Sequence, residues 1–213
     1  MDITLQPYQP DSETAWDEFV LNNRRNATFL HSRKFFLHNP LNAADDASLM
    51  FYKKGKMIGV LPAALLQKEH ELVFHSHPRA TYGGFVTDAS VGVEEALTMV
   101  ETTIAFAKER GATELIIRNS FSIFHQLPSA ETDYAMWFHG FTLKAREIES
   151  CILLQEQPEA AYDDSTWRSV KKAAKSVVVQ QSDDYAAFWQ MLTANLQDRY
   201  DRKPTHTLEQ FME

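Results

Sequence analysis

Apolar positions alternate with polar ones at the start of the chain and then change to a spacing of three to four residues. The alternation over residues 2–8 predicts a strand, and the next apolar stripe predicts a helix that Ser12 caps. The pattern over residues 28–37 predicts a turn and a second helix that closes at His38–Pro40. The first forty residues are therefore expected to give one strand and two helices.

A hairpin is predicted next, because two apolar runs, residues 49–52 and 57–66, flank a short polar turn that contains Gly55. Pro62 lacks a backbone donor and predicts an edge or a bulge in the second run. Further strands are predicted over residues 71–75 and 85–87. Between them, Gly83 and Gly84 indicate either a close backbone approach or a structural bulge.

The clearest helix pattern covers residues 90–110, and Gly111 is placed to end it. The β-branched run 113–118 then predicts a buried parallel strand, so the fold class is α/β, a mixed sheet flanked by helices. Residues 120–138 show more helical spacing, and 142–154 predict one or two further strands. We expect this first domain to span residues 1–155.

The remaining residues, 156–213, restart the pattern after a polar connection. They predict a helix over 166–175, a strand over 177–180 and a helix over 184–199 with Phe188, Leu192 and Leu196 as its buried row; another helix starts at Leu208. One strand and two helices are too few to enclose a core of useful size. This segment is expected either to pack on the first domain or to be an incomplete second one.

The chain of 213 residues carries 29 acidic and 21 basic side chains, a formal charge of -8 that repels polyanions. Cys151 is the single cysteine, so no internal disulfide forms, and a reducing cytoplasm is the simpler expectation. The N-terminus lacks the pattern of a secretory signal, and no apolar run reaches the ~20 residues of a membrane span. We expect a soluble, cytoplasmic protein.

Few residues offer chemistry by spacing alone. Arg168, Lys171, Lys172 and Lys175 share one helix face, which is either an anion site or an ordinary solvated surface. His75 and His77 alternate, but no third ligand is placed nearby, so no metal is assigned. Cys151 fits a buried strand position. No nucleotide-binding glycine motif is found, no Ser-His-Asp order can be singled out, and no catalytic residue is assigned.

Several runs occur in the order and spacing of a known family. NATFLHSRKFF, SLMFYKKGKMIGVLPA and SHPRATYGGFV precede the long helix, and ELIIRNSFSIFHQLPSAETDYAMWFHGF and WRSVKKAAKSVVVQQSDDYAAFWQMLTANLQDRYDRKPTHTLEQF follow it. Together they resemble the FemAB-like branch of the GNAT-superfamily acyltransferases over nearly the whole chain. The resemblance implies a GNAT-like N-terminal lobe at 1–155, and a linker helix with the incomplete start of a second, truncated GNAT-like lobe at 156–213.

The resemblance also implies a reaction and a site. Members of the family transfer an acetyl group from acetyl-CoA, or an amino acid from aminoacyl-tRNA, to a small-molecule or nucleotide-sugar acceptor such as a peptidoglycan precursor. Some members have a lysine where this chain has His38 and Asn39, which leaves the acceptor open. The residues implied for the acceptor pocket are His77, Arg79, Tyr82, Gly83, Gly84, Arg118 and His125, with Arg168 and Lys171 for its phosphates.

Two readings of function follow. The first is an enzyme that acylates an amine on a cell-wall or surface-polysaccharide precursor and is inactive alone if the donor-binding lobe is incomplete. The second is a non-catalytic acceptor-binding or protein-interaction module, which is expected to form a homodimer. A third, binding of charged tRNA, needs a larger basic surface than the face from Arg168 to Lys175.

Overall fold

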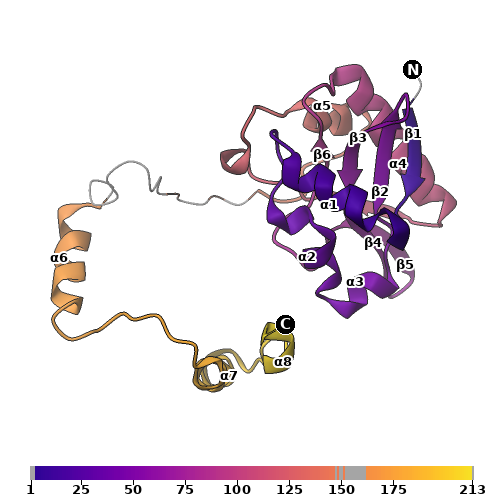
Figure 1. Ribbon diagram of the computed structural model, residues 1–213. Helices are drawn as coiled ribbons and strands as arrows, with labels where there is room; N and C mark the ends of the chain where they lie inside the picture. The colour runs from indigo at the N-terminus through magenta and orange to yellow at the C-terminus, as the bar shows by residue number, and fades with distance from the viewer. Residues whose placement is uncertain (1–2, 147, 149–150, 152–161, 213) are drawn as a thin grey trace. The chain divides into compact units, whose positions relative to one another are not determined.

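The computed structural model describes residues 3–146, 148, 151 and 162–212 (Figure 1). The chain divides into two compact units, Met1–Leu143 and Lys144–Glu213, which are described separately. Strands and their covering helices make up the first unit, whereas the described residues of the second form helices and irregular segments. The predicted boundary near residue 155 lies outside the described residues.

The first sheet of unit 1 has the order β1-β2-β3-β6 and is antiparallel throughout. The predicted hairpin joins its two central strands: Lys53 pairs with Lys56, and Lys54 and Gly55 form the turn with φ of 50° and 79°. Two positive φ values match the twist of the flanking strands. The strands are β1 (Ile3–Pro7), β2 (Leu49–Lys53), β3 (Lys56–Leu61) and β6 (Val86–Thr87).

The second sheet has the order β4-β5-β7. Pro62 separates β3 from β4, so the predicted continuous strand is divided between the two sheets. β4 and β5 are antiparallel, while β5 and β7 are parallel, as the strand-helix-strand pattern predicted. The strands are β4 (Ala63–Lys68), β5 (Glu71–Ser76) and β7 (Glu114–Ile116). The fold class is therefore mixed α/β.

Helices cover both faces of the first sheet (Figure 1). Side chains alternate along β2, so Met50 joins the cluster around Trp16 of α1, while Leu49 and Phe51 join the cluster around Met99 of α4. Gly111, with φ of 82°, ends α4 as predicted. The helices are α1 (Glu13–Asn22), α4 (Val93–Glu109) and α5 (Glu131–Phe138), the last packed on α4.

A buried arginine fixes the short helices that follow α1. Arg33 is fully buried, pairs with the Asp46 carboxylate, donates to Ser48 Oγ at 2.9 Å and stacks over the Tyr8 ring at 3.6 Å. Its charge is thus both paired and packed, as a buried cation requires. This part of the chain contains the helices α2 (Arg33–Leu37) and α3 (Pro40–Ala44) and the single turns η1 (Pro10–Ser12) and η2 (Phe29–His31).

Unit 2 contains α6 (Asp164–Ala173), α7 (Tyr185–Tyr200) and α8 (Leu208–Met212). Asp163 and Asp184 accept backbone hydrogen bonds as N-caps of α6 and α7, which sets where both helices start. None of these three helices contains a buried residue. The unit has helical periodicity without an enclosed core among its described residues.

Several sequence predictions are wrong in unit 1. Ser12 precedes α1 but its side chain accepts no cap hydrogen bond. The close of the second helix, by contrast, is confirmed: α2 ends at Leu37 with His38 as its C-cap, and Pro40 then begins α3, since proline is tolerated in the first turn. Residues 142–146 are not in a strand, and much of the strand prediction over 142–154 lies outside the described residues.

Unit 2 departs from prediction in a different way. Residues 177–180 form no strand, since no described strand offers them hydrogen bonds, and Val179 is 93% exposed. Phe188 of the predicted buried row is 44% exposed. Cys151 is exposed rather than buried in a strand.

Candidate functional site

Two segments far apart in sequence meet at the end of β5. The amide of Gly83 donates to the Arg118 carbonyl at 2.9 Å, and the Arg118 amide donates to Ser76 Oγ at 2.7 Å. The first segment, residues 77–85, follows β5, and the second, residues 117–130, follows β7. Because β5 and β7 are parallel, both segments leave the sheet at the same edge. We call this place the β5–β7 junction.

The two glycines of the junction are needed for space. A Cβ on Gly83 would lie 2.2 Å from His77 Cβ, and one on Gly84 would lie 2.1 Å from Asn119 Oδ1 and 2.8 Å from Asn119 Cα. Contacts this short exclude any side chain without a shift of the neighbouring backbone. The sequence left a close approach and a bulge open, and the geometry is a close approach.

Aromatic rings line the junction. Tyr82 is buried, and its ring centroid lies 5.7 Å from that of Phe121 and 5.6 Å from that of Phe124. Phe124 belongs to the turn η3 (Ser122–Phe124) and is 46% exposed, so the cluster reaches the surface. His31 lies behind it, with its ring 6.0 Å from that of Tyr82. The Tyr82–Phe121–Phe124 ring cluster offers an apolar face for the flat side of a ligand.

Beside the rings lies a polar group of four side chains. Ser120 Oγ and His125 Nε2 are 2.9 Å apart, and Asn119 donates a hydrogen bond to the Asp133 carboxylate. Burial lowers the pKa of His125; the Ser120 carbonyl and the charge of Asp133 oppose that shift, and Arg25 adds to it. Asp133 is exposed as a residue, but partial burial of its carboxyl group raises its pKa. His125 is therefore held in its neutral form near pH 7.

Two further histidines are enclosed beneath the junction. Burial lowers the pKa of His31 to about 4 and that of His77 to about 4, opposed by the carbonyls of Thr28 and Leu30 respectively. His77 packs against Phe36, with 5.0 Å between ring centroids, and has a positive φ of 37°. The family resemblance implies His77 as a pocket residue. Its side chain is fully buried, so it forms part of the pocket wall and is not available to contact a ligand from solvent.

The two implied arginines of the junction differ in their surroundings. Arg79 donates to Asn42 Oδ1 at 2.7 Å and lies 3.6 Å from an Asp45 carboxylate oxygen, so its charge is already met within the fold. Arg118 is exposed, and among the described residues its side chain donates a long hydrogen bond, 3.4 Å, to the Ala80 carbonyl. Arg118 is thus the better placed of the two to meet an anionic group.

Arg168 and Lys171 belong to unit 2, so they are not brought to the junction by any described contact. Both lie on α6 and are exposed; Arg168 Nε donates to the Asp164 carbonyl, and Lys171 Nζ lies 5.4 Å from the Trp167 ring centroid. The basic side chains of α6 are therefore exposed to solvent, and their role as phosphate contacts stays a prediction.

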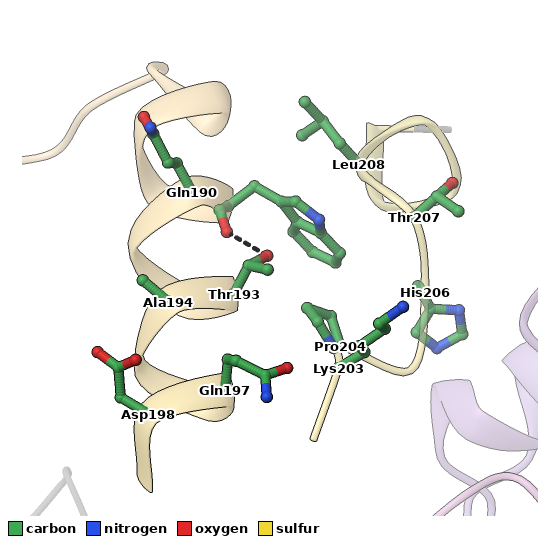
Figure 2. Close-up of a pocket in the computed structure, with 11 residues that line it drawn as sticks. Gln190, Thr193, Ala194, Gln197, Asp198, Lys203, Pro204, His206, Thr207 and Leu208 are labelled. Carbon is green, nitrogen blue, oxygen red and sulfur yellow. Dashed lines mark hydrogen bonds between the residues drawn. The ribbon is translucent and has the colours of Figure 1, made fainter. Parts of the chain in front are cut away.

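Unit 2 also has a groove of about 750 Å³ between α7 and the segment before α8 (Figure 2). A CoA pyrophosphate needs several donors of one sign or a helix N-terminus. The charged lining of the groove is instead one lysine, Lys203, and one aspartate, Asp198, so we assign no acyl donor to it. Its lining residues are Trp189, Gln190, Thr193, Ala194, Gln197, Asp198, Lys203, Pro204, His206, Thr207 and Leu208.

The described residues contain neither a metal-binding group nor a membrane-spanning helix. No three His, Cys, Asp or Glu side chains in that part of the chain are grouped so that they could hold a metal ion. None of the helices there combines the length and the apolar composition of a membrane span.

Sequence reasoning missed Ser120, Asp133 and His31. Ser120 and His125 are five residues apart and separated by η3, a spacing that predicts no contact in a regular element. The order serine, histidine, aspartate over residues 120–133 was the one available signal, and such an order is common by chance. His31 gave none, because its burial depends on the packing of α2.

No family model matches this sequence, and no curated protein matches it. Solved structures that are similar include a ribosomal-protein-alanine N-acetyltransferase from Brucella melitensis biovar Abortus 2308, with 8% identity, TM-score 0.47 and coverage of 71% of this chain and 100% of that one. A GNAT-family acetyltransferase from Streptococcus pneumoniae has 12% identity, TM-score 0.47 and coverage of 68% and 87%. An aminoglycoside 6'-N-acetyltransferase from Acinetobacter haemolyticus has 15% identity, TM-score 0.46 and coverage of 71% and 99%. Similarity of this degree transfers no activity, so function is argued from the junction.

Proposed function

We propose that unit 1 is the acceptor-binding lobe of a GNAT-type, FemAB-like acyltransferase, acting on an amine of a cell-wall or surface-polysaccharide precursor. The observation that carries the proposal is that the segment of Tyr82, Gly83 and Gly84 meets the segment from Arg118 to His125 at the β5–β7 junction: Gly83 bonds Arg118, Tyr82 packs on Phe121 and Phe124, and Gly84 lies against Asn119. The family resemblance implies Tyr82, Gly83, Gly84, Arg118 and His125 for the acceptor pocket, although they come from segments more than thirty residues apart.

The chemistry of the junction suits such an acceptor. A nucleotide sugar carries flat or apolar ring faces, hydroxyl groups and phosphates, and the junction offers exposed Phe124, the Ser120–His125 pair and exposed Arg118 in turn. The acceptor amine must lie in line with the polarised carbonyl of the donor, so positioning supplies most of the rate. In this proposal unit 1 supplies that positioning, and neutral His125 is the group able to take a proton.

Acetyl-CoA or an aminoacyl-tRNA is the proposed donor, and its thioester or ester supplies the activated acyl group. A second function is favoured by one observation: α6, α7 and α8 bury no residue, and the groove beside α7 has a single lysine and a single aspartate as its charged lining, which does not suit a CoA pyrophosphate. In that case the chain is a non-catalytic module that binds the same acceptor.

Binding and turnover separate the two functions. A nucleotide-sugar peptide titrated against the chain is expected to raise its melting temperature, and acetyl-CoA added to the mixture is expected to give a product 42 Da heavier if the chain is the enzyme. Binding without product supports the module. A melting temperature indifferent to every nucleotide sugar contradicts both.

A matched pair of variants locates the binding. Phe124→Ala removes an exposed ring of the cluster and is expected to weaken binding roughly 2- to 10-fold. Phe138→Ala removes a ring that is 59% exposed on α5 and is expected to leave affinity unchanged.

A further inference from the structure

Ser120 and His125 form a hydrogen-bonded serine-histidine pair outside any helix or strand. The separation of 2.9 Å between Oγ and Nε2 is within the range at which a histidine takes the proton of a serine. The other acceptor near Oγ, the Asn26 carbonyl, is 3.4 Å away, so the shorter bond to His125 is the stronger one. Both side chains are half-buried, which leaves them accessible to a small molecule.

The pair is held on a rigid support. The amides of Gln126 and Leu127 donate to the Arg25 carbonyl at 2.7 and 3.2 Å. The segment that contains Arg25 is itself fixed, because Asn23 Oδ1 accepts the backbone amides of residues 25, 26 and 27. The Asn26 side chain in turn bonds Phe85 O and Thr87 N. A pair fixed in this way keeps its geometry without rearrangement when a reaction begins.

Charged and titratable groups face His125 from three directions. Asp133 faces it from α5, Arg25 from the segment after α1 and His31 from η2. Asp133 favours an imidazolium that forms during a reaction, and its own orientation is set by the hydrogen bond from Asn119. A nucleophile, a base and a carboxylate that stabilises the charged base are three parts of a serine acyl-transfer site.

Exposed apolar side chains lie close to the pair in sequence. Ile123, Phe124 and Leu127 are 47%, 46% and 47% exposed, and all three lie within seven residues of Ser120 in sequence. An acyl or aryl group of a few carbons fits such a surface, whereas an ion does not. The pair is thus presented to apolar esters and thioesters.

We propose that Ser120 is a nucleophile activated by His125, and that this chain takes an acyl group from an activated ester or thioester onto Ser120 Oγ. His125 Nε2 accepts the hydroxyl proton while Oγ bonds to the carbonyl carbon. The bond from that carbon to the leaving oxygen or sulfur then breaks, and the leaving group receives the proton from His125. Water, or an amine, attacks the acyl-serine next, gives its proton to His125, and Ser120 recovers that proton as it leaves.

This activity goes beyond the proposed function, in which the acyl group passes directly to a bound amine. It needs no second lobe and no acceptor, because Ser120 itself holds the acyl group. A wild-type chain without esterase activity therefore leaves the acceptor-binding result of the proposed function unaffected, and the reverse also holds.

The test uses 4-nitrophenyl acetate and the whole chain. Release of 4-nitrophenolate is followed by absorbance, and intact mass with peptide mapping locates the acetyl group. We expect an acetylated peptide that contains Ser120, and a loss of at least about tenfold in hydrolysis for Ser120→Ala and His125→Gln. Asp133→Asn is expected to lower the rate by a smaller factor, and the wild-type rate is expected to rise with pH as His125 loses its proton.

The matched control is Ser122→Ala, since Ser122 is an exposed serine two positions along whose side chain is outside the pair. It is expected to react as the wild type does, and circular dichroism of every variant checks that the fold is kept. Acetylation at Ser122 or at a lysine instead of Ser120 overturns the proposal, as does a Ser120→Ala variant with wild-type hydrolysis. Absence of any acetylated wild-type chain overturns it equally.

Discussion

Units 1 and 2 both contain helices with apolar faces, which unit 1 buries and the described part of unit 2 leaves exposed. Trp16 of α1 is fully buried against the first sheet, whereas Phe188 and Met191 of α7 are 44% and 63% exposed. The helical pattern is similar in the two regions, so the difference lies in the surface that each helix meets. A sheet presents a broad apolar face to a helix, and unit 2 has no described strand. Periodicity thus predicts a helix, while burial depends on what the rest of the fold supplies.

The largest contrast is expected from a matched pair of phenylalanines. Phe74 is fully buried in β5, so Phe74→Ala should cost about 3–5 kcal/mol through lost contacts and a cavity. Phe188→Ala in α7 should cost less than about 1 kcal/mol. Amide hydrogen exchange read separately over β2–β5 and over α7 measures both. Equal losses in the two units would contradict the contrast.

The next effect is the pH dependence of unit 1, which has two buried neutral histidines. The pKa of His31 and that of His77 are both lowered to about 4, below the unfolded value of 6.5. The unfolded chain therefore binds more protons between pH 6.5 and 4, so stability falls as pH falls through that window, by up to roughly 3 kcal/mol per histidine.

Urea titrations at pH 7 and pH 4.5 check this dependence. His77→Phe keeps an aromatic ring in the packed site beside Phe36 and removes the titration, so its unfolding midpoint should change less with pH than that of the wild type. A His77→Phe variant with the full wild-type pH dependence would show that other groups are responsible.

A smaller effect is expected at the close backbone approach of the junction. In Gly84→Ala the new methyl group meets Asn119, whose Cα is backbone and cannot rotate away, so we expect a loss of about 1–3 kcal/mol. Gly92→Ala meets only the flexible end of Glu95, at 3.1 Å, and should cost less. Thermal unfolding of the two variants compares their melting temperatures. A lower melting temperature for Gly92→Ala than for Gly84→Ala would contradict the prediction.

The smallest effect is expected in unit 2, at the start of α6. Asp163 accepts backbone hydrogen bonds from Ser165 and Thr166, so Asp163→Ala should remove about 0.5–2 kcal/mol of helix stability. Faster hydrogen exchange of the α6 amides, with α7 unchanged, is the expected readout. Unchanged exchange in α6 would mean that contacts other than the cap hold the helix.

Much of unit 1 was predictable because its local signals agree with its fold. The Lys54–Gly55 turn, the stop at Gly111 and the parallel strand after α4 each follow from backbone conformation or spacing. The division of one predicted strand between two sheets was not foreseen, although Pro62 marked the position. The strand predicted at 177–180 is wrong because β propensity forms no strand without a partner to receive its hydrogen bonds.

The site was predictable only in part, for a physical reason. Resemblance named Tyr82, Arg118 and His125, and it left their mutual contacts unknown. Ser120 and Asp133 joined them through the path of the chain after β7, which no periodicity describes. Irregular segments place side chains by many weak constraints at once, so the chemistry of such a site is visible only when the fold is known.

The most direct test of the acceptor site is amide hydrogen exchange with and without a saturating nucleotide-sugar peptide. The account predicts that residues 80–84 and 119–127 become protected together, because one ligand would contact both segments of the β5–β7 junction. The strands β1 and β2 should exchange at the same rate in both samples. Protection confined to unit 2, or to neither junction segment, would contradict the assignment of acceptor binding to this junction.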